Sequence, residues 1–260
     1  MSDERIHELR QYTLHPGRRD DLVEVFDRWF IEGQEDVGMV VQGQFLDLDR
    51  SDRFVWLRSF PDLERRRAAL EAFYGGPVWA AHRDVANATM TSWDDVLLLR
   101  SVSSVGVTGD DDVAAVAAVT SAASDAGRLA DGRSLPPIGS TERPSTLISI
   151  DIHHFAEPVD QKLLDFFVDE LEPVLTEAGG ERLSLLTTHP GPNTFPALPI
   201  REAQVIVRIA HFDDESAHRA YREHLAQSEH WGRVAAELAA HQSAPPQRLR
   251  LQPTARSRLR

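Results

Sequence analysis

The chain has 260 residues, of which 42% are hydrophobic, so it is long enough for one large domain or two small ones. Its formal net charge of -13 argues against nucleic acid or an anionic membrane as a partner, because both require clustered positive charge. The absence of cysteine excludes disulfides, thiolate metal sites and cysteine nucleophiles. The sequence starts without a signal-peptide pattern and has no bilayer-length apolar run, so we expect a cytoplasmic protein.

The first half begins with a predicted strand over His7–Leu14, which ends at a His-Pro-Gly turn. An amphipathic helix follows, with an apolar stripe of Leu22, Val25, Phe26, Trp29 and Phe30. The remaining stretches predict two strands, an Arg-rich helix and a last strand, at residues 38–48, 53–60, 64–79 and 94–100.

A change of composition marks a boundary between the two halves of the chain. Residues 101–145 are rich in Ala, Ser, Gly, Asp and Pro and predict a flexible connector, within which residues 110–126 can form a short helix. We therefore expect a first domain at 1–100, a linker at 101–145 and a second domain at 146–260.

The second half repeats the order of the first, with a strand over Leu147–Phe155 and a helix that Pro173 ends or kinks. Trp231 lies as far before Leu249 as Trp79 lies before Leu97, which supports an internal repeat. A Pro-rich insertion over Thr188–Glu202 is consistent either with a cover for a barrel mouth or with a tolerated surface loop.

Three motifs resemble the NIPSNAP family: ELRQYTLHPGR at Glu8–Arg18, ERRRAALEAFYGGPVW at Glu64–Trp79 and DDVLLLR at Asp94–Arg100. The second half resembles a diverged copy that lacks the opening motif. The resemblance implies an α+β fold with two ferredoxin-like repeats, whose antiparallel sheets form a pseudo-dimeric barrel with helices outside and a cavity inside. Because both halves lie in one chain, a homodimer is optional.

Alternation along the strands predicts which residues share a face. On this basis we expect the polar side chains on one face of these strands to point into one barrel cavity. The apolar side chains on the other face are then expected to face the helices. The predicted catalytic residues are His153, Asp151, Tyr12, Arg10 and Glu8, and the predicted substrate-binding residues are Trp56, Arg58, Ser149, Gln204 and Arg208.

Asp151 and His153, two residues apart on one strand face, suit a general base and the carboxylate that orients it. The arginines suit an anion clamp, and Tyr12 suits hydrogen bonding to a developing oxyanion. This set predicts acid–base chemistry of isomerase, cyclase, lyase or oxygenase type on a small anionic or aromatic metabolite. The alternative is a buried ion-pair network without catalysis, as in a NIPSNAP-like binding or interaction protein.

No cofactor and no metal site are predicted, although haem with His153 as axial ligand, or a His/carboxylate-bound metal, stays open. His218, His224 and His230 recur every six residues, which spreads them around a helix, so we expect them to be solvated. No nucleotide-binding, nucleophile-elbow or zinc-protease motif occurs.

Overall fold

The computed structural model describes residues 5–102 and 135–260, and the predicted connector at 101–145 lies mostly outside them. The strands occur four to each half. They are β1 (Ile6–Leu14), β2 (Val40–Asp47), β3 (Arg53–Phe60), β4 (Met90–Ser101), β5 (Leu147–Phe155), β6 (Glu181–Thr188), β7 (Gln204–Phe212) and β8 (Gln242–Pro253).

These strands form one closed antiparallel barrel in the order β1-β3-β2-β8-β5-β7-β6-β4. Each half contributes a sheet of four strands, and two seams join the sheets. At one seam Phe45 of β2 pairs with Pro253 of β8, and at the other Leu99 of β4 pairs with Thr188 of β6. Closure leaves neither sheet with a free edge. The fold is therefore a mixed α+β barrel, as expected.

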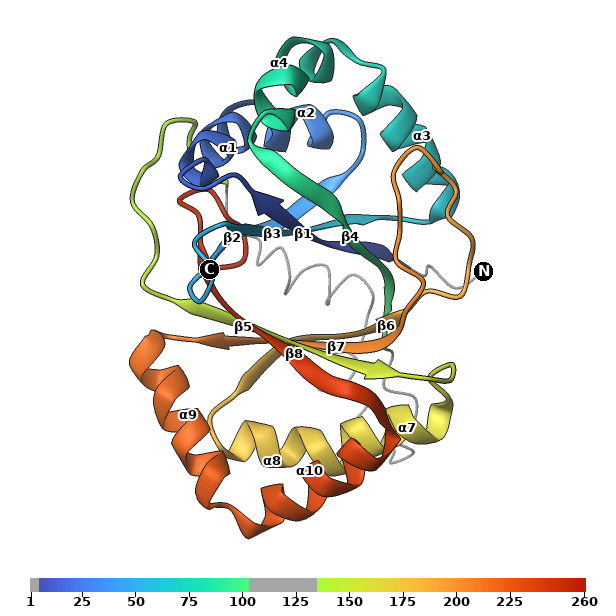
Figure 1. The fold of residues 1–260 in the computed structure, drawn as a ribbon, viewed down its shortest axis with the longest axis vertical. Coiled ribbons are helices and arrows are strands. Elements are labelled where there is room, and N and C mark those ends of the chain that lie inside the picture. Colours follow the sequence, from blue (N-terminus) through green and yellow to red (C-terminus); the bar gives the residue numbers. More distant parts are fainter. Residues whose placement is uncertain (1–4, 103–134) are drawn as a thin grey trace, which may run out of the picture.

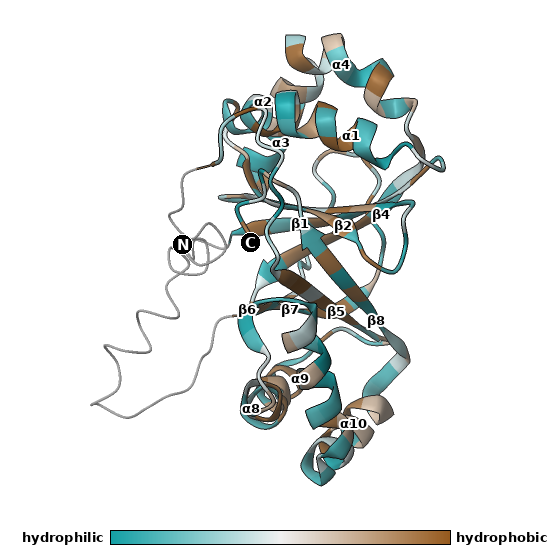
Figure 2. Ribbon diagram, turned by 90° about the vertical axis from the view of Figure 1, so that its left-hand side faces the viewer, coloured by the Kyte–Doolittle hydropathy of each residue, from teal (hydrophilic) through white to brown (hydrophobic). Residues whose placement is uncertain are grey.

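The barrel interior is a packed apolar core to which both halves contribute. Its buried members are Leu9, Phe45, Val55, Leu57, Leu97, Leu99, Ile148, Ile150, Ile152, Leu186, Val205, Val207, Ile209, Leu249, Leu251 and Leu259. Figure 2 shows hydrophobic stretches along the central strands β5 and β7. The apolar residues at every second position of these strands were predicted to face the helices. That prediction is wrong, because through these residues the two sheets contact each other.

Polar side chains occupy the two ends of this interior. Near one end, the buried His7 ring lies 3.1 Å from Gln42 Oε1 and 3.2 Å from Ser101 Oγ. Near the other end, the amides of Gln11 and Gln247 hydrogen-bond each other at 2.9 and 3.3 Å, across the barrel from β1 to β8. These bonds satisfy several of the polar groups that the closed barrel removes from solvent, although Gln42 Nε2 has no partner among the described residues.

Two helical layers cover the outer faces of the barrel, one for each half (Figure 1). The N-terminal layer consists of α1 (Arg19–Val25), the π-helical turn η1 (Phe26–Phe30), α2 (Ile31–Glu35), α3 (Leu63–Tyr74) and α4 (Pro77–Asn87). The C-terminal layer consists of α7 (Gln161–Phe166), the π-helical turn η2 (Phe167–Leu171), α8 (Glu172–Glu177), α9 (Glu215–Gln227) and α10 (Glu229–His241). Across the described ranges, each half thus has the same order of elements.

The first helix of each half contains a π-helical turn at the corresponding place. In the second half, Pro173 lies in the first turn of α8, directly after η2, and the helix continues to Glu177. A proline is tolerated there because its missing N–H falls where the regular α-helical pattern is interrupted. Pro173 therefore marks a change of helix type rather than an end.

The residues after β8 pack against the first half of the chain. Thr254 and Leu259 donate backbone N–H bonds to the carbonyls of Gln44 and Gln42. Arg256 forms an ion pair with Glu32 and Arg258 with Glu35, both on α2. This tail joins the second half to the N-terminal layer. None of the helices over residues 5–102 and 135–260 is long and apolar enough to cross a membrane.

Candidate functional site

The predicted site residues lie in two places on opposite sides of the barrel core. Glu8, Arg10, Tyr12, Trp56 and Arg58 alternate with the interior residues of β1 and β3, so they face the N-terminal layer. The predicted residues of β5 and β7, namely Ser149, Asp151, His153, Gln204 and Arg208, alternate with interior residues in the same way and face the C-terminal layer. The prediction of one shared cavity inside the barrel is therefore wrong.

The physical reason is that both faces of every central strand are buried. Alternation predicts correctly which residues share a face, but it does not say which face points inward. The all-aliphatic faces close against each other, and the mixed faces pack under the helices, where long side chains reach polar partners.

Glu8 lies at the centre of a fully buried cluster with Arg10, Arg58 and Arg66, here called the arginine cluster. Glu8 Oε2 accepts from Arg10 at 3.0 Å and from Arg58 Nε at 2.8 Å, and Oε1 accepts from Arg66 Nε at 2.7 Å. All four side chains are 0% exposed. Arg66 comes from α3 and was not among the predicted site residues.

These ion pairs fix the charge of Glu8. Burial acts to raise the pKa of the Glu8 carboxyl, but Arg58, Arg10 and Arg66 outweigh it and hold that pKa well below its usual range. Glu8 thus stays ionised at neutral pH and is a poor general base. Its geometry suits it to orient arginines.

An aromatic cavity of about 30 Å³ lies beside the cluster, between the outer faces of β1 and β3 and the helices of the N-terminal layer. Its walls are Tyr12, Leu22, Phe26, Phe30, Gln34, Trp56, Phe73, Tyr74, Trp79, Ala86 and Met90. A volume of this size holds about two water molecules. The helix stripe predicted from sequence supplies Leu22, Phe26 and Phe30 to the cavity wall, whereas Trp29, which was predicted in the same stripe, is 42% exposed.

Tyr12 and Trp56 connect the cavity to the arginine cluster. The Tyr12 hydroxyl accepts a hydrogen bond from Arg10 Nε at 3.0 Å, and the Arg10 guanidinium lies 5.5 Å from the centre of the Trp56 ring. Burial raises the pKa of Tyr12, against the opposing effect of Arg10, so the hydroxyl keeps its proton at neutral pH. Trp56 Nε1 is buried and has no hydrogen-bond partner within residues 5–102 and 135–260. Tyr12 and Trp56 both line the cavity, and each has a polar hydrogen that it can donate.

In the C-terminal layer, Arg208 is paired with a carboxylate that the sequence did not suggest. Arg208 Nη2 donates to Glu172 Oε1 at 2.6 Å and to the carbonyl of Gly180 at 2.7 Å. Asp151 lies between Arg208 and Arg248 on the sheet, and its carboxylate is 3.8 Å from Arg248 Nε. Burial raises the pKa of Asp151, and Arg208 and Arg248 oppose that rise.

His153 does not contact Tyr12 or the arginine cluster. Its Nδ1 lies 2.6 Å from Gln242 Nε2, and its ring packs edge-on against Phe167 at 5.2 Å. Burial, followed by Arg248 and Arg208, lowers the pKa of His153 to about 3, so the ring is neutral at pH 7. Asp151 and His153 share a strand face as predicted, and Gln242 is the residue that bonds the ring.

His218 is a second correction. It was expected to be solvated, but it is buried on α9 and packs edge-on against Phe212 at 4.9 Å. Tyr221 and Leu225, three and seven residues later, are the other buried residues of this helix, so His218 belongs to its inward stripe. His224 and His230 are exposed, as expected.

The insertion predicted over Thr188–Glu202 crosses from the second half to the N-terminal layer, where it runs beside α3 (orange in Figure 1). Asn193 and Thr194 accept hydrogen bonds from Arg66 Nη1 at 3.2 and 3.1 Å, and Phe195 stacks on Tyr74. Under this loop is a crevice of about 600 Å³, whose walls include Leu98, Asn193 and Gln204. The loop therefore covers the arginine cluster, not a barrel mouth.

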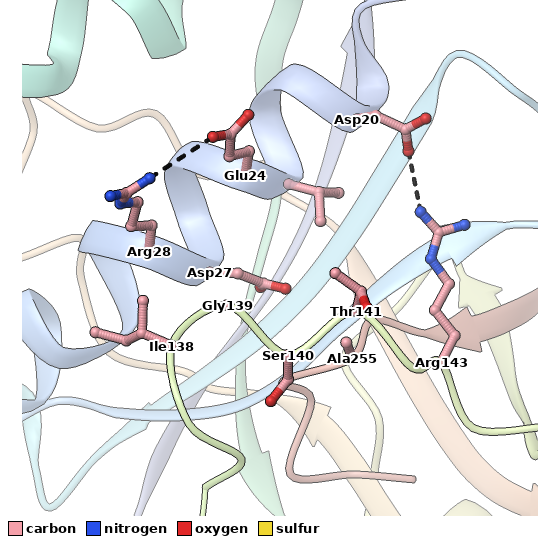
Figure 3. Close-up of a pocket in the computed structure, with 11 residues that line it drawn as sticks. Asp20, Glu24, Asp27, Arg28, Ile138, Gly139, Ser140, Thr141, Arg143 and Ala255 are labelled. Carbon is pink, nitrogen blue, oxygen red and sulfur yellow. Dashed lines mark hydrogen bonds and ion pairs between the residues drawn. The ribbon is translucent and has the colours of Figure 1, made fainter.

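A groove that the sequence did not reveal lies on the outer side of α1 (Figure 3). Its volume is about 530 Å³, and Asp27 lies in its wall between the helix, residues 138–143 and Ala255. Asp20 is paired with Arg143 and Glu24 with Arg28, whereas the Asp27 carboxylate accepts from Thr254 at 3.3 Å. Burial raises the pKa of Asp27 to about 6. Sequence places Asp27 on a polar helix face, and only distant segments bury it.

No group of three or more His, Cys, Asp or Glu side chains that could hold a metal ion occurs among the residues with described positions. The donors of the aromatic cavity are a phenol, an indole N–H and an amide, which are poor metal ligands. The lining of this cavity therefore does not suit a metal ion.

The fold and the site together define an α+β barrel with a buried polar cluster under one helical layer. Residues 7–103 match the family model described as NIPSNAP, which confirms the resemblance seen in the sequence over that segment. No curated protein matches the chain.

Solved structures of the same fold cover nearly the whole chain at low identity. One is described as an anthrone oxidase-like protein, with a TM-score of 0.55 and 15% identity over 97% of this chain and 92% of that one. Two are described as a "putative monooxygenase". The protein from Fusobacterium nucleatum has a TM-score of 0.54 and 7% identity, over 98% of this chain and 94% of that one. The protein from Lactobacillus acidophilus has a TM-score of 0.53 and 9% identity, over 96% and 94%. At these identities the likeness shows the fold alone.

Proposed function

We propose that the protein is a small-molecule enzyme of oxygenase type that binds an aromatic substrate in the aromatic cavity of the N-terminal layer. The observation that carries this proposal is that two residues of the cavity wall, Tyr12 and Trp56, each hold a buried donor, the Tyr12 hydroxyl and Trp56 Nε1. Because Tyr12 already accepts from Arg10, its own proton is free to be donated to a substrate oxygen. Such fixed donors stabilise negative charge that develops on an enolate or phenolate oxygen.

The residues divide into groups with different proposed roles. Tyr12 and Trp56 touch the substrate, Arg10 and Arg58 set the positive potential behind them, and Glu8 holds those arginines in place. Asp151, His153, Ser149 and Arg208 lie beyond the barrel core and are assigned no role in this step, whereas Gln204 lines the crevice under the 189–203 loop. The oxygenase class is favoured over other acid–base reactions because structural neighbours are described as monooxygenases and an oxidase-like protein.

The cavity must enlarge to admit a ring, because about 30 Å³ holds only a pair of water molecules. Its walls are mostly aromatic side chains with few rotatable bonds, so the change requires movement of α4 or of the 189–203 loop. Tyr74 contacts both, through Trp79 and through Phe195.

The test uses oxygen uptake with anthrone, whose methylene group reacts with O₂ to give a carbonyl group and one molecule of water. We expect the wild type to accelerate uptake and Tyr12→Phe to lower kcat about 100-fold, the usual effect of losing one oxyanion donor. Tyr221→Phe is the matched control, because Tyr221 is a buried tyrosine of the C-terminal layer. Equal loss in both variants, or no uptake and no anthrone-induced change in tryptophan fluorescence, would contradict the proposal.

The alternative function is non-catalytic binding, as in a NIPSNAP-like interaction protein. The small cavity volume and the complete ion pairing of Glu8 favour it. In that case Tyr12→Phe leaves ligand binding within a few-fold of wild type, and no turnover accompanies binding.

We also propose that the halves, residues 1–100 and 146–260, are two copies of one unit joined by a linker at 101–145. The shared order of elements and the two π-helical turns at corresponding places support this division.

A further inference from the structure

We propose that the substrate carries a carboxylate next to its aromatic ring and that the arginine cluster binds it. This inference deepens the proposed function and rests on it in placing the ring in the aromatic cavity. It starts from charge: three arginines and one glutamate give the cluster a formal charge of +2. Within the described residues, Glu8 is the only carboxylate that contacts these arginines.

A buried charge without a counterion is costly, and the cost falls when an anion enters. The molecule as a whole has a net charge of -13, yet this excess positive charge lies at 0% exposure. Burial lowers the pKa of Arg66, and the nearby Arg58 and Arg10 lower it further against the effect of Glu8. The positive charge of the three arginines therefore exceeds the negative charge that Glu8 supplies.

Unpartnered donors show where the anion would bind. Arg10 Nη2 and Arg66 Nη2 are buried and have no hydrogen-bond partner among the residues whose positions are described. Both belong to guanidinium groups that contact Glu8, Arg10 through Oε2 and Arg66 through Oε1. A planar carboxylate can accept from two such N–H groups at once, which makes it the matching anion.

Arg10 also connects the arginine cluster to the aromatic cavity. Arg10 Nε bonds the Tyr12 hydroxyl in the cavity wall, while Arg10 Nη1 bonds Glu8. A ring in the cavity and a carboxylate on the cluster are thus neighbours across one guanidinium group. This juxtaposition selects an aromatic carboxylate over a neutral aromatic molecule.

The 189–203 loop provides an entry for the anion. Asn193 and Thr194 hold Arg66 Nη1 with neutral oxygens, and Asn193 also lines the crevice of about 600 Å³ under the loop. Leu98, in another wall of this crevice, pairs directly with Glu8 on the sheet. The crevice therefore ends one residue from the cluster.

The test compares benzoate with benzamide, which has the same ring and nearly the same shape without the charge. We expect isothermal titration calorimetry on the full chain to show that benzoate binds at least 10-fold more tightly than benzamide. We also expect benzoate, but not benzamide, to raise the unfolding temperature. Equal affinity for the two probes, or no binding of benzoate, would overturn the proposal. This comparison needs no substitution, so a folding defect cannot hide the answer.

Variants then locate the binding. Arg66→Gln is expected to reduce the benzoate preference about 10-fold and Arg66→Lys to restore part of it, while Arg67→Gln, at an exposed arginine paired with Glu71, leaves it unchanged. An equal loss in Arg66→Gln and Arg67→Gln would show that the anion binds elsewhere. Charge-selective binding without oxygen uptake, either with anthrone or with an anthrone that carries a ring carboxylate, would leave this inference standing and remove the proposed function. Turnover without charge selectivity would do the reverse.

Discussion

At the scale of residues, the most distinctive feature is the group of charged side chains buried around Glu8. In this group, one carboxylate neutralises part of three guanidinium charges that have no access to solvent. The sequence predicted Glu8, Arg10 and Arg58 as one group, since alternation on paired strands determines their neighbours. It did not predict Arg66, because a helix residue is brought to the cluster only by tertiary packing.

Replacement of Glu8 by glutamine is expected to destabilise the fold by about 3–5 kcal/mol, because it leaves three buried guanidiniums without a counterion. Urea denaturation measures the change in the free energy of unfolding. Glu71→Gln, which breaks only the exposed pair with Arg67, is the control and is expected to change stability by less than about 0.5 kcal/mol. A loss below about 1 kcal/mol for Glu8→Gln would mean that bound water or anions already compensate the arginines.

The buried His7 ring is expected to make the free energy of unfolding depend on pH. Burial lowers the pKa of His7 to about 4 from its ordinary value near 6.5, so between these values the unfolded chain binds a proton that the folded chain does not. The free energy of unfolding is therefore expected to fall as the pH drops from about 6.5 to 4. His153 and His218 add to this loss with the same sign.

Denaturant titrations at pH 7 and pH 4.5 measure this effect. His7→Asn removes the titrating ring, so the variant is expected to lose less stability than wild type between the two pH values. His224→Asn, at an exposed histidine of α9, is the control. An identical pH dependence in wild type and His7→Asn would show that His7 titrates normally in the fold.

At the scale of elements, four of the described helices start at a side-chain cap, whereas α1, α2, α4 and α8 have none. Asp62, Asp160, Asp214 and Ser228 each accept a hydrogen bond from a backbone N–H in the first turn of their helix. Strand positions were also predictable, and β5 spans the residues that its alternation indicated. The π-helical turns were not predicted, because an apolar stripe in the sequence does not distinguish a π-helical turn from an α-helical one.

Asp214→Ala is expected to cost about 1 kcal/mol, because the Ala217 N–H at the start of α9 loses its acceptor. Asp214→Asn is expected to keep most of that stability, since asparagine also caps helices. Asp213→Ala, one residue earlier and exposed, is the control. Thermal unfolding ranks the four proteins, and equal losses at positions 213 and 214 would count against a specific cap.

For the whole molecule, the shared interior makes the two halves depend on each other. Ile150 of β5 and Leu57 of β3 belong to the same buried cluster, and the tail after β8 bonds to β2 and α2. The resemblance to the NIPSNAP family implied the barrel, and alternation in the sequence grouped the residues of each strand face correctly but assigned the faces the wrong way round. The central strands of each half have two faces that are both buried in the fold, and only the partner sheet decides which of them is the interior.

Residues 1–102 and 135–260, produced as two separate chains in one cell, are therefore expected to purify as a 1:1 complex. Each fragment alone exposes its share of the interior, so we expect it to aggregate. Size-exclusion chromatography with a tag on one fragment measures the association. The control carries Ile150→Asp and Val207→Asp, which place charges on the interior face, and it should not associate. Two soluble fragments that stay apart would show that the halves are independent domains.

The packed apolar core between the two sheets also has a consequence for inhibitor design. The pocket beside Tyr12 and the layer around His153 are separated by the tightly packed aliphatic side chains of both sheets, so no small molecule passes from one to the other. An inhibitor selected against one side would not compete with a compound on the other.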